Sequence, residues 1–247
     1  ENSTAYLVLE LVEGRTLAEV LRERRRPFSV DDALDAAVKV GGALSAIHEA
    51  GLLHRDVSPS NVLLSANGDV KLGDFGIAQS LLRQSFPQAS VSSRTKGKLG
   101  YLAPEQVSGR PTDARTDVYA LGLLLFECLT GQRPFGSGDP VAVLTRLFFE
   151  LPPAPSSLRP GLPAALDALV VRLLAQRPDD RPASASEVLL ALEQLQPAPS
   201  ASTSASTSGT TSPPSSSGPG DHLSQAERQL VSVLLVGAPL PSPSQNG

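Results

Sequence analysis

The sequence predicts a mainly α-helical protein of the α+β class with short β-hairpins, and three observations carry this prediction. Apolar residues recur at helical spacing over several long segments. Strand-like runs are few and short, and two of them flank an Asn67-Gly68 turn signal. The chain has 247 residues, 40% of them hydrophobic, which is enough for one domain with a substantial core.

Composition divides the chain into three parts. Residues 1–196 alternate periodic apolar segments with loops, which is typical of a globular domain. Residues 197–220 are almost entirely Pro, Ala, Ser, Thr and Gly, and we expect a disordered linker because such a segment buries too little apolar surface to fold. Residues 221–247 contain an apolar run at 230–236, which predicts either the truncated start of a further domain or a disordered tail.

Charge and cysteine content narrow the class of protein. The net charge of −4 provides no overall field that would attract nucleic acid or acidic membranes. The single Cys128 excludes a disulfide framework and favours a reduced, cytoplasmic protein. No apolar stretch reaches the ~20 residues that a membrane-spanning helix needs. Because the chain lacks an initial Met and runs directly into an apolar segment, we expect it to be part of a longer protein.

The first half should contain one long helix and three strands. A strand is expected at residues 6–10. The long helix should begin after Ser29, whose spacing from Asp32 is that of a capping box, and should end at Gly51. Two strands are expected at residues 62–64 and 70–72.

The second half should be helical. Asp117 precedes an almost wholly apolar run that continues to residue 129 and stops before Gly131, and a helix that is apolar on all sides is usually buried. Asp139 and Pro140 form a helix cap and a first helical position. Two further helices are expected at residues 163–175 and 184–195.

Three short motifs point to phosphoryl transfer. The sequence contains, in order, His54-Arg55-Asp56 with Asn61 five residues after the Asp, then Asp74-Phe75-Gly76, then Ala103-Pro104-Glu105. Phosphoryl transfer needs a carboxylate that accepts the proton of the attacking hydroxyl, and oxygen ligands for Mg²⁺. Asp56 can supply the carboxylate, while Asn61 and Asp74 can ligate the metal. The order and spacing of the motifs resemble those of the eukaryotic-type Ser/Thr protein kinases found in bacteria.

The resemblance covers residues 1–196 and implies a protein-kinase-like large (C-terminal) lobe with its hairpins at the catalytic cleft. It implies ATP and Mg²⁺ as cofactors and protein Ser/Thr hydroxyls as acceptors. The backbone of Glu10 and Val12 would contact adenine, and Leu63 would lie beneath the ring. No Gly-rich loop or Val-Ala-x-Lys strand precedes residue 6, so we expect the small lobe to be absent from this stretch and the fragment to be inactive alone.

The resemblance also implies roles for residues outside the reaction itself. Asp117 would anchor the backbone of the catalytic loop, and Glu105 would form a structural ion pair with Arg181. His48 and His54 have no metal-ligand company in the sequence, so packing and hydrogen bonding are expected for both.

The sequence departs from the kinase pattern at two positions. Ser58 stands where these kinases usually carry a Lys that contacts the γ-phosphate, and Lys98 stands where they usually carry a Thr. We hypothesise that the ammonium of Lys98 reaches the space near Asp56 that Ser58 leaves, because Lys is a flexible point charge. The alternative is a solvated Lys98 and a weaker site.

Two further questions stay open at the level of sequence. Residues 74–105 correspond to the activation segment, where a phosphate on Ser93 or Thr95 could pair with Arg55, although a merely polar loop fits equally well. A pseudokinase or scaffold that binds a partner without catalysis is the alternative function. Ser58 and the missing small lobe favour it, whereas the intact Asp56, Asn61 and Asp74 argue against it.

Overall fold

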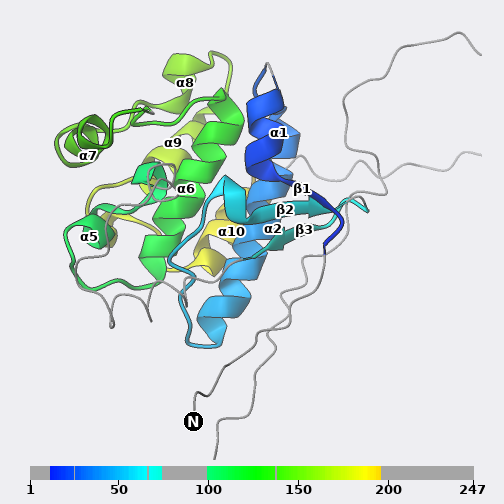
Figure 1. Ribbon diagram of the computed structural model, residues 1–247, viewed down its shortest axis with the longest axis horizontal. Coiled ribbons are helices and arrows are strands. Elements are labelled where there is room, and N and C mark those ends of the chain that lie inside the picture. Colours follow the sequence, from blue (N-terminus) through cyan, green and yellow to red (C-terminus); the bar gives the residue numbers. More distant parts are fainter. Residues whose placement is uncertain (1–11, 25, 66, 74–98, 137, 196–247) are drawn as a thin grey trace, which may run out of the picture.

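The computed structural model describes residues 12–24, 26–65, 67–73, 99–136 and 138–195. In this part of the chain the protein is mainly helical, with one small antiparallel sheet at the edge of a helical body (Figure 1). The predicted α+β class is therefore confirmed. The expected strand at residues 6–10 and the segments 197–220 and 221–247 lie outside the described residues.

The sheet has three strands in the order β1 (Gly14–Thr16), β2 (Val62–Ser65) and β3 (Val70–Leu72). The β2–β3 hairpin lies where its turn signal predicts, and Leu63 pairs with Lys71 on one side and Thr16 on the other. Strand β1 was not predicted, because Gly14, Arg15 and Thr16 include no apolar residue that would indicate a strand. A Cβ on Gly14 would lie 2.1 Å from the carbonyl oxygen of Leu64, so this close pairing requires glycine.

Helix α1 (Leu17–Glu23) follows β1 without a loop. Its N-terminus is closed by a capping box, in which the amide of Glu19 donates to Thr16 Oγ1 at 3.2 Å and the amide of Thr16 donates to the Glu19 carboxylate at 2.8 Å. The box satisfies two amides that have no partner inside the helix, which is how a seven-residue helix is stabilised here.

Two long helices, α2 (Val30–Glu49) and α6 (Ala114–Thr130), form the centre of the domain. Helix α2 begins after Ser29, whose Oγ accepts from the amide of Asp32 at 3.0 Å, as the capping-box spacing predicts. Helix α6 begins at Ala114, one turn earlier than the apolar run indicates, so Asp117 lies inside its first turn. It ends at Gly131, which takes the left-handed conformation with φ +71°.

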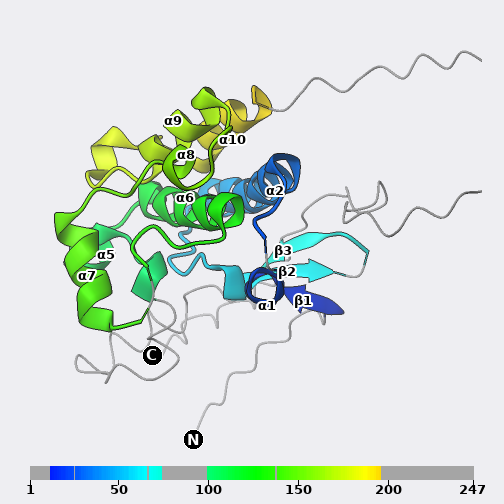
Figure 2. The same cartoon turned by 90° about the horizontal axis from the view of Figure 1, so that it is seen from above.

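The remaining helices surround this centre. Figure 2 shows α2 and α6 between α9 (Ala164–Leu173) and α10 (Ala185–Glu193) on one side and the sheet with α1 on the other. Helices α5 (Pro104–Val107) and α7 (Pro140–Phe149) lie at the end remote from the sheet, and α8 (Pro155–Leu158) packs against α6 and α9. The predicted caps of α7 and α10 are present, since Asp139 accepts from the amides of Val141 and Ala142 and Ser184 from that of Glu187.

Within the described part of the chain, none of the helices combines the length and apolar character that crossing a membrane would require.

Candidate active site

The loop between α2 and β2, residues 50–61, carries the first predicted motif and is called the catalytic loop below. Asp117 of α6 binds its backbone. Asp117 is 1% exposed. Its Oδ2 accepts from the amide of His54 at 2.9 Å, and its Oδ1 accepts from the amide of Arg55 at 2.7 Å. Because the carboxylate lies in the first turn of α6, the helix dipole also stabilises its charge. The anchoring role that the resemblance implies for Asp117 is confirmed.

His48 gives Asp117 a third hydrogen bond. Its Nε2 lies 2.9 Å from Asp117 Oδ2, and it must be the donor because an ionised carboxylate only accepts. His48 and His54 are thus hydrogen-bonding residues, as expected. The sequence did not reveal that the side chain of His48 and the backbone amide of His54 both bind the carboxylate of Asp117, which lies 63 positions after His54.

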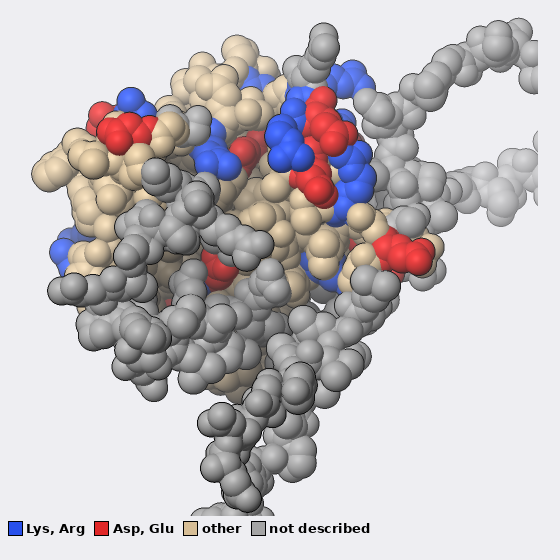
Figure 3. All heavy atoms as spheres, in the orientation of Figure 1, with Lys and Arg blue, Asp and Glu red and all other residues tan. Residues whose placement is uncertain are grey.

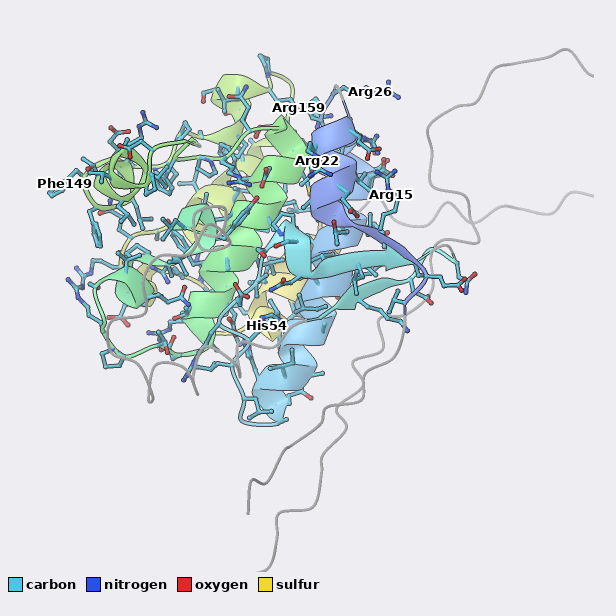
Figure 4. All side chains as sticks on the ribbon, in the orientation of Figure 1. Arg15, Arg22, Arg26, His54, Phe149 and Arg159 are labelled. Atoms are coloured by element: carbon cyan, nitrogen blue, oxygen red, sulfur yellow. The ribbon has the colours of Figure 1, made fainter. Side chains whose placement is uncertain are left out.

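His54 connects the catalytic loop to the end of β3. Its side chain lies beside α2 and α6 (Figure 4), with Nε2 3.1 Å from the carbonyl oxygen of Gly73. The amide of Asp56 donates to His54 Nδ1 at 3.3 Å, so Nδ1 is the acceptor and Nε2 carries the hydrogen. His54 therefore joins the backbone of Asp56 to the residue that immediately precedes Asp74.

Arg55 has a left-handed backbone conformation. Its φ of +62° is the only positive value at a non-glycine residue in the described segments. This conformation costs on the order of 1–2 kcal/mol, so the surrounding hydrogen bonds must maintain it. The amide of Arg55 is held by Asp117, and its carbonyl oxygen accepts from Gln106 Nε2 at 2.9 Å. The conformation of Arg55 thus sets the direction of the backbone at Asp56, the next residue.

Asp56 and Asn61, to which the motif assigns proton acceptance and metal binding, lie in contact. Asn61 Nδ2 donates to the backbone oxygen of Asp56 at 2.7 Å and to its Oδ2 at 3.0 Å. These bonds use the amide nitrogen of Asn61, whereas a metal is bound through the amide oxygen. The backbone of Asn61 is also fixed, because its carbonyl oxygen accepts from the amide of Gly73 at 2.8 Å.

Ser58 is buried and holds a hydroxyl where the resemblance to kinases implies a Lys. Its Oγ lies 2.9 Å from Ser60 Oγ, and its carbonyl oxygen accepts from the amide of Asn61 at 2.9 Å. The hydroxyl is thus part of the loop's own hydrogen-bond network. Lys98, the predicted replacement cation, lies outside the described residues.

The predicted nucleotide and metal residues are only partly described. Val12 and Leu63 are both half-buried, and Val12 precedes β1, whose Thr16 pairs with Leu63. Glu10 and Asp74 lie outside the described residues. Among the residues that are described, no three His, Cys, Asp or Glu side chains gather as a metal site. Mg²⁺ nevertheless prefers oxygen ligands, and the amide group of Asn61 and the carboxylate of Asp56 both contain them.

A buried ion pair supports the segment that carries the third motif. Arg181 Nη1 and Nη2 donate to the two carboxylate oxygens of Glu105 at 2.7 and 3.0 Å, which confirms the expected pair. Thr116 Oγ1 donates to the same carboxylate at 2.9 Å. Burial by itself would raise the pKa of Glu105, but the hydrogen bonds and charge of Arg181, with the Thr116 hydroxyl, lower it below its ordinary value.

Sequence reasoning missed Gln106. Its Oε1 accepts from the amide of Ala103 at 2.9 Å, while its Nε2 reaches the carbonyl oxygen of Arg55. Gln106 lies three residues after Ala103, which is the spacing of a capping box. This spacing was the signal that the sequence offered. The contact with Arg55 had no such signal, because 51 positions separate the two residues.

This site defines a class of protein. A carboxylate and an amide from one loop, anchored by an Asp from a buried helix and followed by Asp-Phe-Gly and Ala-Pro-Glu, are the parts of a protein kinase. A family model described as the protein kinase domain matches residues 1–191, and the chain belongs to this family.

Curated relatives are bacterial kinases. The chain is 40% identical over 197 residues to a probable serine/threonine-protein kinase of Corynebacterium efficiens, covering 78% of the chain and 30% of the relative. It is 39% identical over 183 residues to serine/threonine-protein kinase PknB of Mycobacterium tuberculosis, covering 74% of the chain and 29% of the relative. The chain thus spans about 30% of the length of these relatives.

A solved structure agrees with the fold. The crystal structure of the Mycobacterium tuberculosis PknI kinase domain matches with a TM-score of 0.58 and 32% sequence identity, covering 76% of this chain and 64% of that one. The kinase-like fold predicted from the motifs is confirmed.

Proposed function

We propose that this chain is the hinge and large lobe of a kinase that transfers the γ-phosphate of ATP to Ser and Thr hydroxyls of proteins. The observation that carries the proposal is the pairing of Asp56 with Asn61 on a loop held by Asp117 and His54. The names of the relatives support serine/threonine specificity.

In this proposal Asp56 orients the acceptor hydroxyl and takes its proton as the oxygen attacks the γ-phosphorus. The bond between that phosphorus and the β,γ-bridging oxygen breaks, and ADP leaves. Asn61 and Asp74 would hold Mg²⁺, which supplies positive charge against the phosphate oxygens. The Asn61–Asp56 hydrogen bond keeps the carboxylate oriented, and the Gly73–Asn61 bond keeps the loop in register with β3.

The nucleotide would bind between the hinge and β2. We infer that the backbone of Glu10 and Val12 contacts adenine and that Leu63 forms the apolar surface beneath it. The position of Leu63 in the middle of the sheet supports this inference, because a strand residue is held more rigidly than a loop residue.

We propose that Lys98 supplies the cation that Ser58 does not. Lys98→Ala should lower kcat by about tenfold to a thousandfold, because removal of a single charge at a phosphoryl-transfer site has effects of this order. Lys98→Arg should keep part of the rate, since the charge is retained. Steady-state kinetics on the full-length protein measures both, and an Ala variant with the wild-type kcat contradicts the proposal.

Arg55 is exposed beside Asp56, which supports a role in binding a phosphate on the activation segment, with Ser93 and Thr95 as first candidates.

We also propose that the kinase acts in the cytoplasm, where ATP is made, on proteins and not on nucleic acids. The division into domain, linker and a further segment at residues 196 and 220 is likewise a proposal.

The direct test is phosphate transfer from ATP and Mg²⁺ to a Ser/Thr-rich protein by the full-length protein and its Asp56→Asn variant. We expect transfer by the wild type and its loss, by about a thousandfold or more, in the variant. Residues 1–247 alone should transfer phosphate poorly, because no Gly-rich loop or Val-Ala-x-Lys strand is among them.

The second candidate function is a pseudokinase or scaffold, which the loss of the cation at Ser58 favours. Folded full-length protein that transfers no phosphate to itself or to a range of proteins would support the scaffold. Transfer that is equal in the wild type and in Asp56→Asn would point to a contaminating kinase.

A further inference from the structure

A pocket of about 360 Å³ lies outside the catalytic loop, where α5, α7 and the segment after α9 meet. Its apolar surface comes from Pro104, Leu147, Phe148 and Pro178, and Arg110 and Arg177 also line it. Figures 1 and 2 both place α5 and α7 side by side at the end of the molecule remote from the sheet. None of the roles derived above uses this pocket.

The walls of the pocket are joined by hydrogen bonds. Gln176 Nε2 donates to the carbonyl oxygen of Glu150 at 3.1 Å, which ties the segment after α9 to the end of α7. Arg181 donates to the carbonyl oxygens of Ala175 and Gln176 at 2.7 and 3.0 Å and also binds Glu105 of α5. The pocket is therefore formed before any ligand arrives, and a ligand that binds there does not have to order it.

The charge at the pocket is positive. Arg110 and Arg177 are exposed, and neither forms an ion pair with any residue that the structure describes. Asp179, the acidic residue of the lining, is engaged by Arg115 at 2.5 Å. An anionic ligand would thus meet two available guanidinium groups in a chain whose net charge is −4.

Two large apolar side chains are exposed at the end of α7, one on either side of the exposed Glu150. Phe149 is 83% exposed and Leu151 is 80% exposed. Figure 4 shows the Phe149 side chain pointing away from the domain. Figure 3 shows acidic and basic side chains both near α7 and over α1, so the exposed apolar side chains at the end of α7 have charged neighbours. Large exposed apolar groups beside a positive pocket are typical of a protein-interaction site and not of a small-molecule site.

We propose that this pocket, with Phe149 and Leu151, is a docking site for an acidic segment of a protein substrate that carries a large apolar side chain. The apolar side chain would enter between Phe148 and Pro178, and flanking carboxylates would bind Arg110 and Arg177. Identification of the ligand as a substrate rests on the proposed kinase function, whereas binding of the segment does not.

The position of the pocket relative to Asp56 supports a substrate as the occupant. Helix α5 lines the pocket with Pro104 and contacts the catalytic loop through Gln106 and the carbonyl oxygen of Arg55. A segment docked in the pocket would therefore hold the rest of its protein near the catalytic loop, because α5 connects the two rigidly. Tethering of this kind raises the effective concentration of an acceptor hydroxyl and lowers KM.

Fluorescence anisotropy with the full-length protein and a fluorescein-labelled peptide tests the binding. The probe has one Phe flanked by Asp and Glu residues. One control peptide replaces Phe with Ser, and the other replaces the acids with Asn and Gln. We expect the probe to bind and both control peptides to bind at least about tenfold more weakly. Equal binding of all three peptides, or binding of none, overturns the proposal.

Matched variants locate the site. The double variant Arg110→Glu/Arg177→Glu should raise the Kd of the probe by about tenfold or more, since both guanidinium groups are replaced by repelling carboxylates. Arg22→Glu is the control, because Arg22 is an exposed arginine on α1, far from Phe149 (Figure 4), and its Kd should equal that of the wild type. A double variant with the wild-type Kd overturns the proposal.

Two further measurements separate this proposal from its alternatives. If the surface pairs two copies of this chain, sedimentation will show a dimer that Phe149→Asp dissociates and that the probe does not, and the docking proposal then fails. Phosphate transfer is measured on the same wild-type preparation with Asp56→Asn beside it. Probe binding without Asp56-dependent transfer keeps the docking site and rejects the kinase function, whereas transfer without probe binding does the reverse.

Discussion

A small number of side chains determine the conformation of the catalytic loop. Asp117 binds the amides of His54 and Arg55, and Gln106 binds the carbonyl oxygen of Arg55. Arg55 is thereby held from both of its peptide groups in a backbone conformation that few non-glycine residues adopt. Asp56 follows directly, so the orientation of this proposed catalytic residue depends on residues to which no part in the proposed reaction is assigned.

Gln106 is a positioning residue in this arrangement, and substitution can isolate its role. Gln106→Glu keeps the acceptor for the amide of Ala103 but places a carboxylate oxygen against the carbonyl oxygen of Arg55. We expect kcat to fall by about tenfold, the equivalent of one lost hydrogen bond, with little change in the KM for ATP. Gln106→Ala should show a smaller loss, because it removes the contact without adding repulsion. A Glu variant with the wild-type kcat would remove Gln106 from this role.

Helix α6 is the element on which the other parts of the site depend. Its first turn provides Asp117 for the catalytic loop and Thr116 for Glu105, and its apolar side chains are buried along its length. Helix α9 packs closely against it at Gly122. A Cβ at this glycine would lie 2.7 Å from Leu173 Cβ and 3.1 Å from Leu174 Cδ2, distances that only a displaced helix could relieve.

Two glycine-to-alanine substitutions compare this close packing with an open helix position. Gly122→Ala should lower the free energy of unfolding by about 1–3 kcal/mol, because the added methyl group overpacks the α6–α9 contact. Gly42 lies in α2 with nothing within 4 Å of an added Cβ. Gly42→Ala should raise the free energy of unfolding by roughly 0.5–1 kcal/mol, since Ala favours helix. Urea unfolding measures both, and equal effects would contradict the packing argument.

At the scale of the whole molecule, the Glu105–Arg181 pair joins α5 to the segment that connects α9 and α10. Arg181 also donates to the carbonyl oxygens of Ala175, Gln176 and Arg115, so one side chain links three parts of the fold. Its guanidinium lies over the ring of Tyr119 at 4.5 Å. Because these partners are buried, loss of the carboxylate would leave an uncompensated positive charge inside the protein.

The pair predicts a specific dependence of stability on pH. The pKa of Glu105 is lowered from its ordinary value of 4.5, so the unfolded chain binds a proton more readily than the folded one. The stability that the pair provides is fully present above pH 4.5 and decreases as the pH falls through the lower folded-state pKa. Urea unfolding between pH 7 and about pH 3 should show this loss.

Two Glu-to-Gln variants serve as the test and its control. Glu105→Gln should be less stable by about 3–5 kcal/mol at pH 7 and should lose less stability on acidification than the wild type. Glu187 also has a lowered pKa, through the amide of Ala183 and then Arg172, but its ion pair is exposed. Glu187→Gln should therefore differ little from the wild type at pH 7. An equal effect of the two variants would show that burial of the Glu105 pair does not matter.

Much of the fold could be read from local patterns. The caps at Ser29, Asp139 and Ser184 and the turn at Gly68 lie where their residue types indicate. Helix α6 begins one turn before its apolar run, at Ala114, because Asp113 caps it there. The apolar pattern did not show this turn, since its residues are mostly polar. Strand β1 was not predicted because its sequence, Gly-Arg-Thr, contains no apolar residue.

The candidate site divides in the same way. The roles predicted for Asp56 and Asn61 came from motif spacing and stay predictions, while the structure places Asn61 Nδ2 3.0 Å from Asp56 Oδ2. Those predicted for Glu10, Asp74 and Lys98 remain predictions, since these residues lie outside the described part of the chain. The capping-box spacing at Gln106 was a signal for a helix start but not for its contact with Arg55, and no pattern indicated the pocket at Arg110 and Arg177.

The sequence by itself determined the longer helices, the caps at Ser29, Asp139 and Ser184, and the hairpin, because hydrogen bonds within a turn involve neighbouring residues. The short helices α1, α5 and α8 were not predicted. Only the tertiary structure decided how these parts are held. The bond between Gln106 and Arg55 spans 51 positions, that between Arg181 and the carbonyl oxygen of Arg115 spans 66, and the pocket joins three separate segments. Such contacts depend on how whole helices pack, and packing is not encoded in any one stretch of the chain.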